Sequence, residues 1–400
     1  MTSLPEPIVC DVLIVGMGPA GATAAYELSR AGLSVIGLDK AAHPRYKVCG
    51  GGLSARIDGI LDAGYKSVVE QTITGVEFTY QGKRSLLVQS SPPIAYMVMR
   101  DRFDHFLVEK ARRAGTHVYE DEPVVGCVQR ADAVEVTTRK RRYRARVLIG
   151  ADGANSIVAQ RLFPGRAGRR LPTLEAEVAL GHAPVYPGEN RVIIELGSTK
   201  WGYAWVFPKR EAVSIGLADF EGPIANPKGL FQRFVGVMPG LSTMTIPPPY
   251  GHPLPLYPST RLNNVGRHHV VHDRAVLVGD AAHLVDPLFG EGIYYAIRSG
   301  QLAALQIRAA FADSGSGLEG YADSLRREIY PEFDVATRLA DVIYTYPRLC
   351  HRLIARYPEV LELYYDVLRG RETYQSFVTK AKRHVKTSIK DFLRKAVSLR

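Results

Sequence analysis

The first forty residues contain the feature that most restricts the fold of this chain. An apolar run at residues 11–15 is typical of a buried strand, and Gly16, Gly18 and Gly21 follow it before a helix-forming run. A second apolar run ends at Asp39, eighteen residues after Gly21. In such a motif the glycines permit a tight turn, a close approach of pyrophosphate and close helix–strand packing, while the acid binds ribose hydroxyls. The order predicts a Rossmann-like nucleotide-binding unit in an α/β fold.

A second glycine-rich segment, residues 279–293, follows another apolar run. Asp280 is expected at the carboxyl end of a strand, where a carboxylate can accept hydrogen bonds from sugar hydroxyls. Gly290 and Gly292 precede a helix that starts near Ile293, and a helix N-terminus favours negative charge, such as that on the pyrimidine edge of a reduced flavin. The first motif alone leaves NAD and FAD open. The second segment favours FAD.

The composition is that of a globular enzyme. The chain has 400 residues, a length sufficient for two or three structural units. Of these residues 46% are hydrophobic and 23% are charged, which are ordinary values for a globular protein. We find no signal peptide and no apolar run long enough to span a membrane. The four cysteines (Cys10, Cys49, Cys127 and Cys350) are far apart, which argues against disulfides, a zinc site and an iron–sulfur cluster. We therefore expect a reducing cytoplasm as the compartment.

The formal charge of +11 has two local sources. The basic run at residues 139–144 lies between two strand-like segments, and we interpret it as a solvated hairpin. At residues 377–399, apolar and basic residues alternate at helical spacing. This pattern is typical either of a peripheral membrane contact or of a capping helix with a solvated face. No nucleic-acid-binding module accompanies the charge, so nucleic acid is not an expected partner.

The order of the patterns predicts three regions. A discontinuous FAD-binding domain is expected at residues 1–75, 96–170 and 264–315. A substrate domain built on an antiparallel sheet is expected at residues 76–95 and 171–263, because short strand-like runs separated by turns fill residues 172–220. Residues 316–400 form a C-terminal helical region. We expect the substrate to bind at the domain boundary, and the protein to be a monomer.

Four segments resemble the geranylgeranyl reductase family within the para-hydroxybenzoate-hydroxylase-like flavoproteins, over about residues 8–310. They are the first glycine motif, the element Lys47-Val-Cys49-Gly50-Gly51, the segment Arg100-x-x-Phe103-Asp104 with the Asp152-Gly153 turn, and the strand Tyr203-x-Trp205-x-Phe207-Pro208 followed by Gly216. The last of these is the most specific to the reductases. The chain departs from the family pattern at Ala218, where a second glycine is usual, and at His283 and Asp286, where small residues and Asn are commoner. His283 is interpreted either as a proton relay or as a structural histidine.

The resemblance implies roles for particular residues in these and neighbouring segments. Asp280 would bind the ribityl chain, Gly292 and Ile293 the pyrimidine edge, Arg100 the phosphates or ribityl, and Val124 the adenine. The full set of expected cofactor-binding residues is Gly16, Gly18, Ala20, Gly21, Asp39, Lys40, Cys49, Gly50, Gly51, Arg100, Val124, Asp152, Asp280, Gly290, Gly292 and Ile293. No metal site is expected.

Three residues are candidates for a direct part in the chemistry. Cys49 is expected beside the flavin ring, where its thiol either donates a proton or packs as a small polarisable group. Tyr203 and Trp205 alternate with Phe207 along one strand, so their side chains should share a face. That face is either a wall for a prenyl chain or ordinary core.

The resemblance therefore predicts an FAD-dependent reductase that hydrogenates carbon–carbon double bonds of a geranylgeranyl chain on a diphosphate, lipid or chlorophyll-type substrate. NADPH or reduced ferredoxin is the expected external electron donor. The alternatives are a flavin monooxygenase or halogenase on the same fold, and an electron-transfer flavoprotein that acts on quinone. Tyr203 and Phe207 differ from the corresponding Trp and Ile of halogenases, which favours the reductases.

Overall fold

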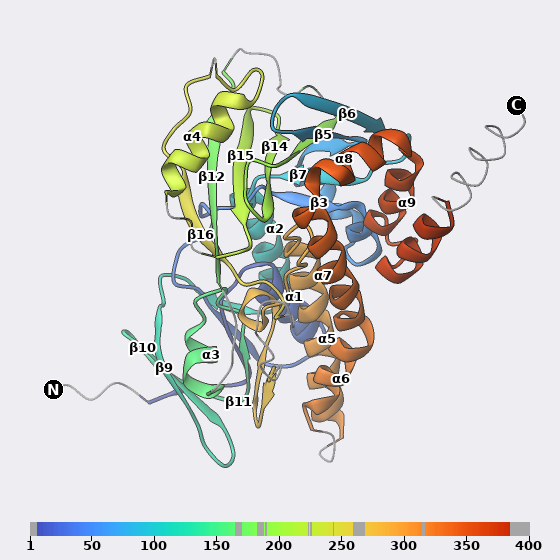
Figure 1. The fold of residues 1–400 in the computed structure, drawn as a ribbon. Coiled ribbons are helices and arrows are strands. Elements are labelled where there is room, and N and C mark those ends of the chain that lie inside the picture. The colour runs from blue at the N-terminus through green and yellow to red at the C-terminus, as the bar shows by residue number, and fades with distance from the viewer. Residues whose placement is uncertain are drawn as a thin grey trace, which may run out of the picture. The chain divides into compact units, whose positions relative to one another are not determined.

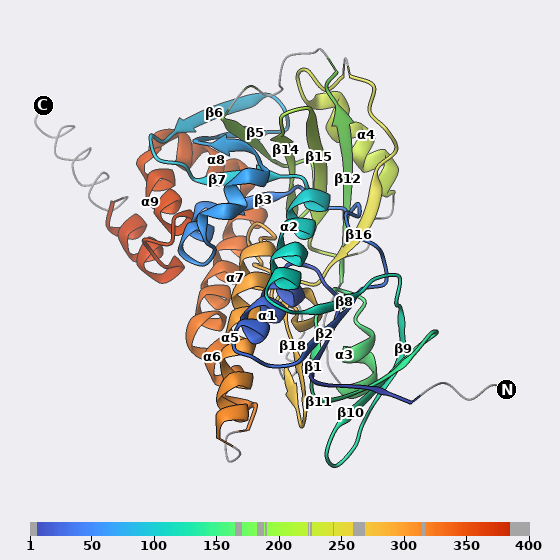
Figure 2. The same cartoon turned by 180° about the vertical axis from the view of Figure 1, so that it is seen from behind.

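The computed structural model describes residues 6–164, 170–181, 188, 190–222, 224, 226–242, 244–258, 269–313 and 317–384. The chain forms two compact units, each assembled from segments far apart in sequence, as the colours of Figures 1 and 2 show. Unit 1 consists of Met1–Val48, Met99–Leu171 and His252–Asp334. Unit 2 consists of Cys49–Val98, Pro172–Gly251 and Val335–Arg400.

Unit 1 is built on a sheet whose main path has the order β17-β18-β11-β1-β2-β8. The pairs β18–β11, β11–β1, β1–β2 and β2–β8 are parallel. Strand β1 is apolar and buried on both faces at Val12, Leu13 and Ile14, as expected for a parallel sheet. The strands are β1 (Ile8–Val15), β2 (Val35–Leu38), β8 (His117–Tyr119), β9 (Val124–Gln129), β10 (Val134–Thr138), β11 (Arg142–Gly150), β17 (Val271–His272) and β18 (Ala275–Leu277).

The helices of unit 1 pack against its sheet and against one another. Helix α1 begins directly after β1 and packs against β1, β2, α2 and α5, while α3 packs against β9, β11 and β18. The helices are α1 (Pro19–Arg30), α2 (Arg100–Arg113), α3 (Ile157–Leu162), the 3-10 helix η4 (Gly279–Ala282), α5 (Ile293–Ala312) and α6 (Glu319–Glu328). Helix α7 (Tyr330–Thr345) starts in unit 1.

Unit 2 contains a seven-stranded sheet in the order β16-β12-β15-β14-β13-β5-β6 and a three-stranded sheet in the order β3-β7-β4. In the larger sheet β13 pairs with β5 in parallel, whereas β12, β15, β14 and β13 form an antiparallel series. The strands are β3 (Gly52–Ser54), β4 (Val69–Ile73), β5 (Gly75–Tyr80), β6 (Arg84–Gln89), β7 (Ala95–Val98), β12 (Leu171–Ala179), β13 (Arg191–Leu196), β14 (Gly202–Pro208) and β15 (Ala212–Asp219). Strand β16 (Tyr250–Leu254) begins in unit 2, and its residues from His252 onward belong to unit 1.

One face of this larger sheet is covered by α4 (Pro227–Val237). Its residues Leu230, Phe231 and Phe234 join the core formed by side chains of β12 to β15. The remaining helices of unit 2 are η1 (Ala55–Gly59), η2 (Ala63–Val68), α8 (Pro347–Arg356) and α9 (Glu359–Leu368). The α/β architecture, with an antiparallel sheet and C-terminal helices, agrees with the fold predicted from the sequence.

The boundaries of the compact units differ from the domain boundaries that we expected. Residues 49–75 group with the sheet of unit 2, and not with the glycine motif of unit 1. The reason is strand pairing, since β3 and β4 both pair with β7. Of the described C-terminal residues, 317–334 group with unit 1 and 335–384 with unit 2.

The structure describes the basic segment at residues 139–144 in full and the one at residues 377–399 only in part. Residues 139–144 lie at the turn of the antiparallel hairpin β10–β11, which confirms the predicted hairpin. Arg141 of this turn pairs with the buried carboxylate of Glu122 at 2.8 Å. From residue 385 onward, the basic segment at residues 377–399 lies outside the described residues. Within the described ranges, no helix is long and apolar enough to cross a membrane.

Candidate functional site

The turn after β1 is held by a backbone hydrogen bond to the end of β2. The Gly16 N–H donates to the Leu38 carbonyl at 2.7 Å, and Gly16 has a φ of +96°, which favours glycine. A Cβ on Gly16 would collide with the backbone of Ala151 and Asp152, so the turn passes directly beside the β11 terminus. A Cβ on Gly21 would overlap the Gly16 carbonyl oxygen. Both glycines are therefore required by close backbone packing.

Gly18 stands in front of α1 as its N-cap residue, and no side chain caps this helix. Among the described residues, the atom that comes within 4 Å of a Cβ built on Gly18 is Nη2 of Arg45, at 3.8 Å. The N-terminus of α1 thus has free backbone N–H groups and a guanidinium beside it. That combination suits a pyrophosphate.

Asp39 directly follows β2 and is buried, with 5% of the residue exposed. Its carboxylate accepts hydrogen bonds from the backbone N–H groups of Met17 at 2.9 Å and of Ala41 at 3.0 Å. Arg45 Nε lies 3.7 Å from the same carboxylate. Asp39 therefore fixes the glycine turn as well as offering oxygen atoms to a ligand hydroxyl.

A group of cations surrounds this turn within unit 1. Arg100, the first residue of α2, donates from Nε and Nη2 to Asp104 at 2.8 and 2.9 Å, and Arg45 reaches the same carboxylate at 3.3 Å. Lys47 Nζ lies 2.6 Å from Nε2 of His252. Burial, together with the charges of Lys47, Arg100 and Lys40, lowers the pKa of His252 to about 4. His252 is therefore neutral at neutral pH, and its Nε2 can accept a hydrogen bond from Nζ of Lys47.

The sequence interpretation included Arg100 and Lys40 but missed Arg45, Lys47 and His252. Arg45 and Lys47 lie within four residues of Cys49 in the sequence. Two basic residues so close to an expected cofactor-binding residue could have indicated an anion-binding role. His252 had none, because 205 residues separate it from Lys47.

The second glycine segment surrounds the N-terminus of α5. Gly292 is the N-cap residue of α5, no side chain caps it, and Ile293 is the first residue of the helix. A Cβ on Gly292 would stand 3.6 Å from Oδ1 of Asp280, so the Asp280 carboxylate faces the start of the helix. Gly290 has a φ of +65°. Among the described residues, no hydrogen bond engages the half-buried Asp280 side chain, so its oxygens are available to ligand hydroxyls.

The two glycine segments meet where α1 packs against α5. Gly279 has a φ of +57°, and a Cβ there would stand 3.0 Å from the Cβ of Ala20. A Cβ on Gly300 of α5 would overlap the Ala20 carbonyl oxygen. Ala20 is 5% exposed, so its role is close helix packing that aligns both segments.

The two departures from the family pattern, Asp286 and His283, both lie at turns of this segment. Asp286 is fully buried, and its Oδ1 accepts from the N–H groups of Leu288 at 2.7 Å and Phe289 at 3.1 Å. It thereby shapes the loop that leads to Gly290. His283 ends η4 in the left-handed conformation, with a φ of +56°.

Asp152 and Val124 lie at other parts of unit 1. Oδ2 of Asp152 accepts from the N–H groups of Ile157 at 2.7 Å and Val158 at 3.3 Å, which caps α3. Its Oδ1 is buried without a hydrogen-bond partner among the described residues, and burial raises the pKa of this carboxyl. Val124 begins β9, where it pairs with Thr138.

Cys49, Gly50 and Gly51 belong to unit 2. The Gly51 N–H donates to the Cys49 sulfur at 3.4 Å, and Cys49 is half-buried. Gly51 has a φ of +72°, and a Cβ there would overlap the Val98 carbonyl oxygen. A Cβ on Gly50 would stand 2.9 Å from the Phe207 ring and 3.1 Å from Nε1 of Trp205. The glycine run is therefore held flat against the aromatic side chains of β14.

The aromatic side chains of β14 share one face, as their alternation predicts. Ring centroids are 5.9 Å apart for Tyr203 and Trp205, and 6.1 Å for Trp205 and Phe207. Tyr203 and Trp205 are each only 7% exposed, whereas Phe207 is half-buried. A Cβ on Gly216 would overlap the Trp205 ring, so Gly216 makes room for the indole.

Two buried polar contacts support this face. Nε1 of Trp205 lies 3.3 Å from Oγ of Ser214, and Ser214 Oγ lies 2.9 Å from the buried carboxylate of Glu175. Lys209, which is 1% exposed, pairs with Glu177. Its Cε lies 3.5 Å from the position of a Cβ on Gly51. Lys209 directly follows the aromatic motif in sequence, but it was missed as a site residue.

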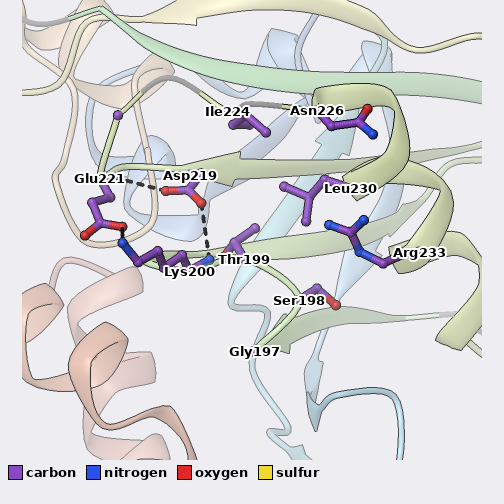
Figure 3. A pocket seen from close by; sticks show the side chains of 11 residues that line it. Gly197, Ser198, Thr199, Lys200, Asp219, Glu221, Ile224, Asn226, Leu230 and Arg233 are labelled. Carbon is purple, nitrogen blue, oxygen red and sulfur yellow. Dashed lines mark hydrogen bonds and ion pairs between the residues drawn. The ribbon is translucent and has the colours of Figure 1, made fainter.

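Unit 2 also has an open pocket of about 740 Å³ between the β13–β14 loop and α4 (Figure 3). Lys200 pairs with Glu221 at 2.6 Å, and Asp219 accepts from the backbone N–H groups of both residues. Arg233 reaches the pocket from α4. No residue that we expected in the site lines this pocket, so it is separate from the glycine run and the aromatic face.

Comparison with known proteins identifies the chain. A family model described as an FAD binding domain matches residues 9–218. A geranylgeranyl diphosphate reductase of Rhodobacter capsulatus is 30% identical over 92% of each chain. The chain belongs to the geranylgeranyl reductase family. A digeranylgeranylglycerophospholipid reductase of Thermoplasma acidophilum is also 30% identical, over 74% of this chain and 76% of that protein.

Solved structures agree on the fold. A geranylgeranyl bacteriochlorophyll reductase-like protein of Thermoplasma acidophilum superposes with a TM-score of 0.74, at 24% identity over 85% of this chain and 88% of that chain. A flavin-dependent brominase has a TM-score of 0.73, at 19% identity over 95% of this chain and 100% of that chain. At these identities the structures show a shared fold.

As a member of the geranylgeranyl reductase family, the chain is an FAD-dependent oxidoreductase. The residues of unit 1 fit the cofactor. Two helix N-termini without side-chain caps, at Gly18 and Gly292, are available to anionic groups of a ligand. Asp280 and the unpartnered Oδ1 of Asp152 supply acceptors for hydroxyl groups.

Proposed function

We propose that the protein hydrogenates carbon–carbon double bonds of a geranylgeranyl (polyprenyl) chain on a diphosphate, lipid or chlorophyll-type substrate. The observation that carries the proposal is the packing of Gly50 on Trp205 and Phe207, which joins two segments shared with the reductases. Similarity to a geranylgeranyl diphosphate reductase over 92% of the chain supports it.

The residues of unit 1 are proposed to hold FAD as follows. The pyrophosphate binds at the N-terminus of α1 beside Gly18, with Arg45 as the nearest charge. Asp39 binds the ribose, and Asp280 binds the ribityl chain. The N–H groups at the start of α5, next to Gly292, bind the pyrimidine edge.

Other expected contacts complete the cofactor site. Lys40 and Arg100 add positive charge near the phosphates, and they already influence His252. The backbone around Val124 is proposed to border the adenine, and Asp152 to accept from a cofactor hydroxyl or a bound water. Each of these roles rests on the resemblance and on the position of the residue in unit 1.

In the reaction, bound FAD supplies a hydride equivalent in its reduced form. An isolated alkene accepts hydride poorly, so a proton must be delivered at the same time. We propose the Cys49 thiol as the proton donor, because the Gly51 N–H fixes the position of its sulfur. The aromatic face that includes Tyr203 and Trp205 is proposed to exclude water and to contact the prenyl chain.

The test is an anaerobic single-turnover experiment. The purified holoprotein is reduced chemically and then mixed with geranylgeranyl diphosphate or with a digeranylgeranyl phospholipid. Flavin reoxidation, with a product two hydrogens heavier for each bond reduced, is the expected result. If reoxidation instead requires oxygen and gives an oxygenated or halogenated product, the proposal is wrong.

The same assay addresses the electron donor and Cys49. NADPH and reduced ferredoxin, our two proposed donors, are compared by the rate at which each reduces the flavin. Cys49→Ala is expected to slow flavin reoxidation by the alkene about 10²-fold or more, the usual range for losing a general acid. Its rate of flavin reduction by the donor should be unchanged. Equal reoxidation rates in Cys49→Ala and the native protein would make Cys49 a packing residue.

A further inference from the structure

Helix α8 presents two different rows of side chains to solvent. Arg348, Arg352 and Arg356 recur every four residues and form one row, and all three are exposed. Leu349 and Leu353 form the adjacent row, with exposed fractions of 52% and 44%. An apolar row beside a row of arginines is the pattern of a helix that lies in a membrane interface.

The opposite face of α8 fixes the helix to unit 2. Cys350 and His351 are buried, and the His351 ring lies 6.4 Å from the ring of Tyr80, at the end of β5. Helix α8 packs against β5, as both ribbon views show (Figures 1 and 2). The two exposed rows therefore have a fixed orientation on the unit.

More apolar surface adjoins the row of leucines. Tyr346, which directly precedes α8, is 58% exposed, and Val342 in the last turn of α7 is 54% exposed. Exposed apolar side chains that gather in this way mark an interaction site more often than scattered ones do. Tyrosine is also common at the level of lipid head groups.

The charged residues between Asp341 and Glu359 have one sign. This stretch contains Arg348, Arg352 and Arg356 but no Asp or Glu. Arg348 also lines a pocket of about 210 Å³ together with Lys83 and Arg84. Three cations around one hollow are suited to a phosphate group.

We propose that the outward rows of α8, with Val342 and Tyr346, dock this protein onto an anionic phospholipid membrane. The leucines enter the interface, and the arginines contact lipid phosphates, one of them in the pocket formed by Lys83, Arg84 and Arg348. A second copy of the chain is a poorer occupant, because a two-fold contact would bring like-charged arginine rows together. The inference concerns binding only and does not depend on which alkene is reduced.

The test is sedimentation of the full-length holoprotein with vesicles. We expect binding to vesicles of phosphatidylcholine with phosphatidylglycerol, weaker binding to phosphatidylcholine alone, and a decrease with added salt. Changing Arg348, Arg352 and Arg356 to Ala should lower the partition coefficient about a hundredfold. Changing Leu349 and Leu353 to Ser should lower it about tenfold.

A matched control removes three other exposed arginines, Arg113, Arg139 and Arg210, by substitution with Ala. This variant has the same net charge as the α8 variant, and we expect nearly native binding. A chain that ends at His384 should also bind, which separates α8 from the basic segment beyond it. Thermal unfolding of each variant checks that it is folded.

Several outcomes would overturn the inference. Equal loss in the two arginine variants would assign the binding to net charge, and loss on truncation would assign it to residues 385–400. If the leucine variant binds vesicles normally but loses concentration-dependent self-association, α8 pairs with a second copy. If neither α8 variant affects binding, α8 is not the docking surface.

Discussion

A Cβ on Gly21 would overlap the carbonyl oxygen of Gly16, because α1 starts directly against the turn that leaves β1. This contact brings the N-terminus of α1 to its place beside Arg45. Gly21→Ala must push the helix away from the turn, at a cost of about 1–3 kcal/mol. We expect the FAD affinity to fall about tenfold to hundredfold, measured by quenching of FAD fluorescence on titration with apoprotein.

Gly126→Ala is the matched control, since Gly126 lies in β9 of the same unit with nothing within 4 Å of its Cβ position. Its FAD affinity should equal that of the native protein. An equal loss in both variants would show that the Gly16–Gly21 contact has no special part in cofactor binding.

Arg45 is expected to bind the pyrophosphate of FAD. Its Nη2 lies 3.8 Å from the Cβ position of Gly18, and its guanidinium is shared with Asp39 and Asp104. Arg45→Gln should lower the FAD affinity about tenfold to hundredfold, the range for a hydrogen bond to a charged group. The difference should shrink as salt is added, because salt screens the lost charge. Arg113→Gln, at an exposed position on α2, should leave the affinity unchanged.

Ser214 connects Trp205 and Glu175 inside the sheet of unit 2. The Ser214 hydroxyl accepts a hydrogen bond from Nε1 of Trp205 at 3.3 Å and donates one at 2.9 Å to the carboxylate of Glu175, a residue that is 1% exposed. Ser214→Ala removes both. We expect the free energy of unfolding to fall by about 1–3 kcal/mol, as measured by urea denaturation. Ser67→Ala removes an exposed hydroxyl and should change it by less than about 0.5 kcal/mol. A Ser214→Ala change as small as that of the control would contradict the structural role.

Local patterns predicted the features that depend on neighbours in sequence. The alternation of Tyr203, Trp205 and Phe207 predicted their common face, because successive side chains of a strand point to opposite sides. The glycine spacing likewise predicted the turn at Gly16 and the start of a helix after Gly292. Such signals follow from the geometry of one element.

Contacts between segments far apart in the sequence could not be predicted from these local patterns. Gly50 was expected among the cofactor-binding residues, but its packing on the rings of Phe207 and Trp205 was not predicted. The ion pair of Lys209 with Glu177 depends on strand order, which spacing does not reveal. The pairing of β3 and β4 with β7, which groups residues 49–75 with unit 2, left no signal for the same reason.

The stability of the protein should depend on pH through His252. Burial and the charges of Lys47, Arg100 and Lys40 lower its pKa from 6.5 to about 4. In the unfolded chain His252 takes up a proton as the pH falls below about 6.5, whereas in the folded protein it stays neutral until about pH 4. Since only the unfolded state gains from this protonation, the stability is fully present above pH 6.5 and decreases between pH 6.5 and pH 4.

His252→Gln keeps a side-chain oxygen that can accept from Lys47 but cannot titrate. We expect the melting temperature of this variant to fall less than that of the native apoprotein between pH 7 and pH 5, in a buffer without phosphate. His117→Gln is the control, because His117 is an exposed residue of β8 in the same unit. Bound FAD should reduce the effect in the native protein, since its pyrophosphate offsets the positive charges that disfavour protonation of His252. Parallel melting curves for native and His252→Gln protein would show that His252 titrates alike in the folded and unfolded states.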